Sequence, residues 1–151
     1  MTQFIRTVSE NEDFQTLVAL LDADLARRDG DEHAFYAQFN KIATIRNAIV
    51  CYVDDKAIGC GAFREYDESK VEIKRMFVLP QYRGHGIALK ILNELELWAA
   101  EFNYRGYILE TGKKQPEAIR LYQKAGYSMI PGYGQYLNVE NSVCMMKTVF
   151  S

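Results

Sequence analysis

Three β-rich runs separated by short polar turns occupy the middle of the chain, at residues 48–53, 57–64 and 71–78. Short polar turns between such runs are typical of an antiparallel meander. Pro80 follows the third run, and because proline cannot continue a sheet ladder, this strand should end there. The centre of the protein is therefore predicted to be an antiparallel sheet.

Helical spacing appears before the meander. Ser9 and Glu12 have the spacing of a capping box, Ser at the cap and Glu three residues on. Apolar residues follow at helical intervals, and Gly30 is a natural stop. Residues 33–41 predict a second, shorter helix that carries Phe35, Tyr36 and Phe39.

The chain beyond the meander alternates between helix and strand. Residues 86–103 predict a long helix whose apolar stripe is Ile91, Leu95, Trp98 and Phe102. Pro116 suits the first turn of a last helix, which runs to Ala125 and stops at Gly126. Further strands are predicted at residues 4–8, 107–111, 127–130 and 142–149.

A helix between the fourth and fifth strands predicts that this pair runs parallel. The expected fold is therefore α/β (α+β in some schemes): a mostly antiparallel mixed sheet of about seven strands, flanked by about four helices.

A chain of 151 residues fits one domain, residues 1–151. A domain of this length can bury a core without a metal ion or a disulfide to stabilise it.

Composition narrows the range of partners. A net charge of −2 argues against a nucleic-acid-binding surface, and no apolar run approaches a membrane span. The N-terminus lacks the pattern of a secretory signal, so the cytoplasm is the expected compartment. The three dispersed cysteines are predicted to be small, buried, apolar side chains. His33 and His85 are too few for a His-rich metal site. Oligomeric state stays open, with a homodimer as one alternative.

The turn at residues 78–88 joins an apolar strand to an amphipathic helix through Arg83, Gly84 and Gly86. Helix N-termini present unpaired N–H groups and suit phosphate binding. A P-loop pattern is absent, and Leu89 stands where a dinucleotide fingerprint needs a third Gly or Ala. An Arg-x-x-Gly-x-Ala turn for a pyrophosphate remains, against the alternative of a turn that only links strand to helix.

At this point the chain resembles the GNAT superfamily of N-acyltransferases. Residues 83–88 fit the family's [Arg/Gln]-x-x-Gly-x-[Gly/Ala] pattern, which binds the pyrophosphate of acetyl-CoA. Residues 72–78 look like its Glu-Ile-x-x-x-x-Val strand, and residues 118–127 are similar to its Ala-x-x-[Leu/Phe]-Tyr-x-Lys-x-Gly-[Phe/Tyr] helix. The chain departs from many members at Gln115, where they carry an Asn that touches the cofactor.

The resemblance implies an acetyl-CoA-dependent N-acetyltransferase that acts by direct attack of an amine, with CoA as product and no metal. It also implies a fourth and fifth strand that splay apart to admit the pantetheine arm. The cofactor-binding residues that it implies are Met76, Phe77, Val78, Arg83, Gly84, His85, Gly86, Ile87, Ala88, Tyr122 and Lys124. Among these, the backbone N–H of Val78 is the expected oxyanion donor.

Two residues are candidate catalytic groups. The resemblance places Glu72 at the strand position of a general base, which partial burial could support by raising its pKa. The alternatives are a solvent-facing Glu paired with Lys70 or Lys74, or a water chain as base. Tyr122 is the candidate general acid for the departing thiolate, because a neutral phenol is protonated at pH 7; the alternative is a core tyrosine.

The acceptor is predicted only as a primary amine of a small molecule or peptide. Tyr36 on the second helix, Tyr133 and Tyr136 in the last loop, and Glu110 as a partner for a cationic acceptor are candidate substrate contacts. For the second helix plain core packing is the alternative, and for Glu110 a structural lysine partner. A catalytically silent acyl-CoA-binding module on the same fold is the alternative function.

Overall fold

The computed structural model describes residues 1–29 and 45–149. Its elements in chain order are β1 (Thr2–Thr7), α1 (Glu12–Asp29), β2 (Asn47–Val53), β3 (Lys56–Glu65), β4 (Lys70–Val78), α3 (Ile87–Glu101), β5 (Gly106–Gly112), α4 (Pro116–Lys124), β6 (Ser128–Ile130) and β7 (Ser142–Thr148). Short 3₁₀ turns lie at Pro80–Tyr82 and Gly134–Tyr136.

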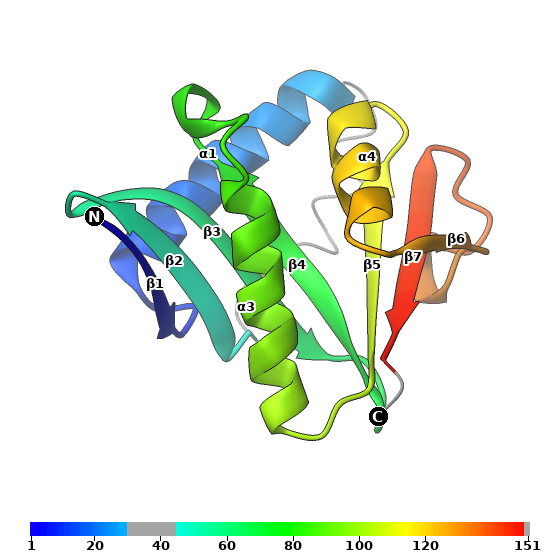
Figure 1. The fold of residues 1–151 in the computed structure, drawn as a ribbon. Helices are drawn as coiled ribbons and strands as arrows, with labels where there is room; N and C mark the ends of the chain where they lie inside the picture. The colour runs from blue at the N-terminus through cyan, green and yellow to red at the C-terminus, as the bar shows by residue number, and fades with distance from the viewer. Residues whose placement is uncertain (30–44, 150–151) are drawn as a thin grey trace.

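One seven-stranded sheet has the order β1-β2-β3-β4-β5-β7-β6. Every neighbouring pair is antiparallel except β4 and β5, which are parallel. Helix α1 covers one face, and α3 and α4 cover the other (Figure 1). The predicted mixed sheet and its parallel pair are confirmed. Three α-helices lie in the described part of the chain, fewer than the four predicted, and the helix expected at residues 33–41 falls outside it.

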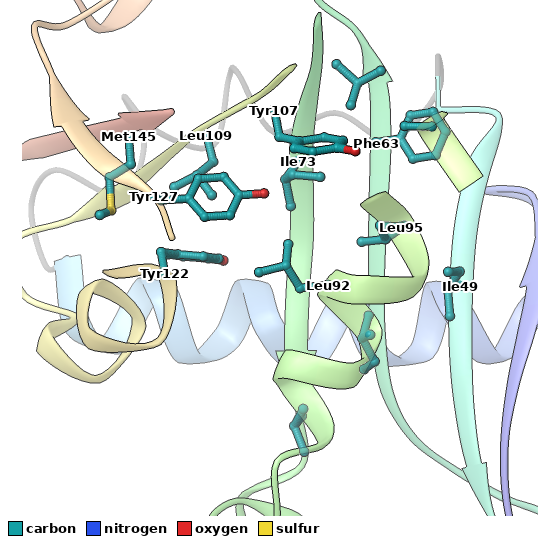
Figure 2. Packing of buried hydrophobic residues seen from close by; sticks show 14 of the residues in the cluster. Ile49, Phe63, Ile73, Leu92, Leu95, Tyr107, Leu109, Tyr122, Tyr127 and Met145 are labelled. Atoms are coloured by element: carbon teal, nitrogen blue, oxygen red, sulfur yellow. The ribbon is translucent and has the colours of Figure 1, made fainter. Parts of the chain in front are cut away.

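Alternation along the strands builds a separate core on each face. On β2, Ala48 and Val50 point toward α1, whereas Ile49 and Cys51 belong to the cluster under α3 and α4. Successive side chains of a strand point to opposite faces, so an apolar run of this kind serves two helical layers. Figure 2 shows the larger core, in which the Tyr122 and Tyr127 rings lie beside Leu109 and Met145.

The start of α1 corrects the predicted capping box. The helix begins at Glu12, and the side-chain Oδ1 of Asn11 accepts a hydrogen bond from the Phe14 N–H at 2.9 Å. Asn11 is therefore the N-cap, and Ser9 is a buried residue two positions earlier. The capping-box pattern was wrong by two residues because Asn caps a helix as well as Ser does.

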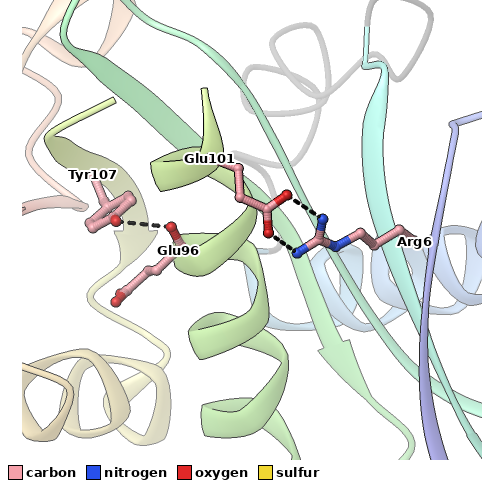
Figure 3. A network of polar contacts seen from close by, with 4 residues as sticks. All are labelled: Arg6, Glu96, Glu101 and Tyr107. Carbon is pink, nitrogen blue, oxygen red and sulfur yellow. Dashed lines mark hydrogen bonds and ion pairs between the residues drawn. The ribbon is translucent and has the colours of Figure 1, made fainter. Parts of the chain in front are cut away.

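Polar contacts fix α3 against the sheet (Figure 3). Arg6 of β1 donates two hydrogen bonds to Glu101, at 2.8 and 2.7 Å, and the Tyr107 hydroxyl donates to the Glu96 carbonyl at 3.0 Å. The predicted apolar stripe holds for Ile91 and Leu95 at the centre of the helix. It fails at Phe102, which is 57% exposed because the helix has already ended at Glu101.

The parallel pair is short, and this opens the sheet. Strands β4 and β5 pair only from Lys70–Gly106 to Glu72–Ile108, although β4 continues to Val78. A β-bulge sits just beyond: Arg75 has φ +61°, and two residues of β4 stand opposite Gly61 of β3. The second half of β4 therefore leaves β5 and creates space between them.

Candidate active site

The turn that precedes α3 holds two glycines in the left-handed region. Gly84 has φ +85°, and Gly86, the N-cap of α3, has φ +78°. A Cβ built at either position would meet no protein atom within 4 Å, so the space beside this turn is open. The first N–H groups of α3 have no partner within the helix and face the same end. This combination fits an anionic ligand such as a diphosphate.

Arg83 ties the turn to the end of β4. Its Nε donates to the Val78 carbonyl at 2.8 Å, and its guanidinium lies 5.5 Å from the centre of the Phe77 ring. One of the guanidinium donors is thus used within the protein. The side chain remains exposed and stays beside the glycine turn.

A cleft of about 290 Å³ runs from this turn to α4 and is called the helix-side cleft. It follows the free end of β4, the glycine turn and the first turn of α3. Its lining residues are Leu21, Asp24, Met76, Phe77, Val78, Tyr82, Arg83, Gly84, Gly86, Ile87, Ala88, Leu89, Gln115, Glu117, Ala118, Leu121 and Tyr122.

A second cavity, of about 110 Å³, lies where β4 and β5 separate and is called the strand-side cavity. More charged side chains line this cavity than line the cleft. Its lining residues are Leu21, Leu25, Glu72, Ile73, Lys74, Arg75, Met76, Glu110, Thr111, Gly112, Gln115, Ala118, Tyr122 and Tyr136. The two spaces share Leu21, Met76, Gln115, Ala118 and Tyr122, so they meet at these side chains.

Tyr122 stands at this junction. It is 6% exposed, and its ring packs edge-on against Tyr127 with centroids 5.8 Å apart. Burial, and after it the Glu110 carboxylate, raise the pKa of Tyr122 above its ordinary value. The phenol is therefore protonated at neutral pH and can donate a proton at the point where the two spaces meet.

Glu72 is buried rather than solvent-facing, which overturns one of the alternatives for it. It is 2% exposed and lines the strand-side cavity. Arg64 Nε donates to its Oε1 at 2.9 Å, and the Tyr133 hydroxyl donates to its Oε2 at 2.7 Å. Lys70, one of the expected partners, is paired with Asp67 at 3.0 Å.

Further charged groups of the cavity come from β4 and β5. Lys74 is 8% exposed, and burial lowers its pKa, an effect that the Glu72 charge opposes. Arg75 is also buried and pairs with Asp22 at 3.1 Å. Glu110 accepts a hydrogen bond from the Ser142 hydroxyl at 2.8 Å. The cavity thus combines carboxylates and cations on one short stretch of sheet.

Sequence reasoning named Lys74 only as a partner for Glu72, missed Arg75 and set Gln115 aside. The place of Lys74 in the cavity could have been predicted, because Lys74 lies two residues from Glu72 and strand alternation puts both on one face. Arg75 could not, since its place depends on the bulge and its positive φ. Gln115 is the N-cap of α4 and lines both spaces.

The predicted site residues fall into three groups. Those that line the helix-side cleft are Met76, Phe77, Val78, Arg83, Gly84, Gly86, Ile87, Ala88 and Tyr122; those that line the strand-side cavity include Glu72, Glu110 and Tyr136. His85 and Lys124 are exposed and line neither space. Tyr133 also lines neither, but it contacts Glu72, and Tyr36 lies outside the described residues.

Within residues 1–29 and 45–149, no group of three or more His, Cys, Asp or Glu side chains is placed to hold a metal ion. None of the helices described there is long and apolar enough to cross a membrane.

A parallel strand pair that splays beside a glycine turn and a helix N-terminus defines a class: acyltransferases that take their acyl group from coenzyme A. The acetyltransferase (GNAT) family model matches residues 14–127, more than half of the chain. The protein therefore belongs to the GNAT family, whose general reaction is acetyl-CoA-dependent acetyl transfer. The resemblance found in the sequence is confirmed.

Individual relatives agree with this assignment. The chain is 30% identical over 138 residues to an IAA acetyltransferase of Azospirillum brasilense, covering 86% of this chain and 89% of that protein. Among solved structures, a provisionally named acyl-CoA N-acyltransferase of Klebsiella pneumoniae has 28% identity and a TM-score of 0.84, with 99% of each chain covered. The PaiA N-acetyltransferase of Thermoplasma acidophilum, solved with coenzyme A, shares the fold at 15% identity and a TM-score of 0.73, covering 98% of this chain and 99% of that one.

Proposed function

We propose that this protein transfers an acetyl group from acetyl-CoA directly to a primary amine of a small molecule or peptide. The observation that carries the proposal is the junction at Tyr122, where an open cleft beside a helix N-terminus meets a smaller, charged cavity. Direct transfer needs two substrates to reach one point from different sides. The helix-side cleft suits the thioester carrier, and the strand-side cavity suits the amine.

The cofactor side follows from the glycine turn. The N–H groups of residues 84–88 and the Arg83 side chain would hold the diphosphate of coenzyme A. The free edge of β4 at Met76 to Val78 would lie along the pantetheine arm, with the Val78 N–H as oxyanion donor. Bound there, acetyl-CoA supplies the activated acyl group.

The amine side depends on two proton transfers. Glu72 accepts the ammonium proton, directly or through a water, and Tyr122 donates a proton to the departing thiolate. Burial raises the pKa of Tyr122, so the phenol carries its proton at neutral pH. Glu110 and Tyr136, which line the same cavity, are proposed acceptor contacts.

The remaining proposals concern the whole chain. We place residues 1–151 in one catalytic unit that works in the cytoplasm. The three cysteines are free and buried, as expected of thiols in a reducing compartment.

A thiol-release assay with acetyl-CoA tests the function. The panel of acceptors contains polyamines, amino acids, aminoglycosides and peptide N-termini, each with a matched control without amine. We expect amine-dependent release of CoA with one of these classes. Tight CoA binding, measured by calorimetry, without release on any amine would favour the silent binding module instead.

A further inference from the structure

Glu72 is held by two donors from distant parts of the chain. Arg64 lies directly opposite it in the β3–β4 pair, and Tyr133 belongs to the loop between β6 and β7. We propose that Arg64 and Tyr133 are positioning residues that hold the Glu72 carboxylate turned toward the acceptor amine. This inference rests on the proposed function, in which Glu72 is the base.

The Tyr133 ring is fixed independently of its hydrogen bond. It packs edge-on against Tyr66, with centroids 5.3 Å apart, and against Tyr136 at 5.5 Å. Tyr136 is 2% exposed and lines the strand-side cavity. A ring clamped between two others has little freedom, so the Tyr133 hydroxyl meets Glu72 with a small entropic cost. Tyr133 therefore contacts Glu72, the proposed base, but lines neither the helix-side cleft nor the strand-side cavity.

The two hydrogen bonds leave the Glu72 carboxylate with free acceptor positions. Arg64 uses one oxygen and Tyr133 the other, whereas an ionised carboxylate offers about two acceptor positions on each. The second position on each oxygen can receive an ammonium proton or a water.

Other titratable groups also lie close enough to the Glu72 carboxylate to interact with its charge. Those on the elements packed around it are Lys74 of β4, Tyr136 of the last loop and Cys144 of β7, with Glu110 of β5 on the same cavity. Arg64 and Tyr133 donate hydrogen bonds to the Glu72 carboxylate itself, at 2.9 and 2.7 Å.

The test uses Tyr133→Phe, which keeps the ring and removes the hydroxyl. Tyr66→Phe is the matched control. It removes a hydroxyl from the same aromatic cluster but leaves the hydrogen bond from Tyr133 to Glu72 in place. With an amine that the wild type acetylates, Tyr133→Phe should lower kcat about tenfold or more. Arg64→Gln should also lower kcat, and Tyr66→Phe should match the wild type.

A double-mutant cycle separates positioning from direct contact with substrate. In a Glu72→Gln background, Tyr133→Phe should change kcat by less than about twofold, because it acts only through the missing carboxylate. Multiplicative effects would overturn the positioning role while leaving the acetyltransferase function intact. A wild type that turns over no amine would instead contradict the proposed function, and this inference with it.

Discussion

At the scale of single residues, the proposed chemistry depends most on Tyr122. Its motif in the sequence suggested an acid but allowed a core tyrosine, and the structure shows a side chain that is both buried and part of two cavity walls. A group can serve packing and chemistry at once when its ring faces the core and its polar end faces a ligand.

The first prediction concerns this hydroxyl. Tyr122→Phe should lower kcat by about 10²-fold, since that is the lower end of what a positioned acid contributes. The KM for acetyl-CoA should stay within about twofold, because the ring and its contact with Tyr127 remain. Steady-state thiol release at saturating amine measures both. Unchanged kcat would remove Tyr122 from the chemistry.

Gly86 gives a second prediction at the same scale. Gly86→Val should abolish acetyl-CoA binding, because its side chain would enter the space left for the diphosphate and its φ of +78° disfavours a β-branched residue. Gly134→Val is the matched control: it also has positive φ and open space, but it lies in the last loop.

Calorimetric titration with acetyl-CoA distinguishes the two variants. We expect heat with Gly134→Val and none with Gly86→Val. Equal affinity in both would mean that the diphosphate binds elsewhere.

At the scale of elements, strand β4 does most to build the site. Its first residues pair with β5 in parallel, its bulge turns the chain at Arg75, and its last residues leave β5 while they stay paired with β3. The same strand therefore carries the base candidate at one end and the cleft edge at the other. Helix α3 must approach this bulge closely, and Gly61 of β3 allows it.

The third prediction follows from that approach. A Cβ at Gly61 would lie 2.6 Å from Met76 Sδ, 2.8 Å from Ile91 and 2.9 Å from Leu95. Gly61→Val should therefore destabilise the fold by about 1–3 kcal/mol through overpacking. Gly112→Ala is the control, because its nearest contact is an ordinary 3.4 Å. Urea unfolding measures both, and a Gly61→Val variant as stable as the control would show that α3 can move away.

At the scale of the whole molecule, buried phenols join the helices to the sheet. Tyr127 donates to Glu96 Oε2 at 2.8 Å, and Lys147 of β7 donates to Oε1 at 2.9 Å. Burial, and then the Glu96 charge, raise the pKa of Tyr127. Burial also raises the pKa of Tyr107, Tyr122, Tyr133 and Tyr136.

The fourth prediction concerns alkaline stability. A tyrosine whose folded pKa is raised keeps its proton longer in the folded state, so its contribution is complete below the ordinary value of 10 and is lost as the pH rises above it. The free energy of unfolding should therefore fall between about pH 9 and about pH 11. Urea unfolding across this range, with tyrosinate absorbance, measures the loss.

Two variants test the cause. Tyr127→Phe should be less stable at neutral pH but should lose less free energy on the alkaline side than the wild type. Tyr66→Phe removes an exposed tyrosine and should follow the wild-type slope. Tyrosinate formation near pH 10 without loss of structure would contradict the prediction.

The order of strands and helices could be predicted because it depends on local patterns. The meander at residues 48–78 shows short turns, and the long helix shows a regular apolar stripe until it ends. The glycine turn at residues 83–88 could also be predicted, because Gly84 and Gly86 both take positive φ there. The capping-box spacing predicted Ser9 as the cap of the first helix, and this was wrong because Asn11 caps it.

Local sequence patterns therefore specify the set of elements, the glycine turn and the residue types available for the proposed acetyl transfer. Which of these residues meet depends on tertiary packing. The bulge at Arg75, the early end of β4–β5 pairing and the 61-residue separation between Glu72 and Tyr133 are set by long-range packing. Local patterns report on neighbours within a turn or two, whereas a site depends on residues that packing brings together from far along the chain.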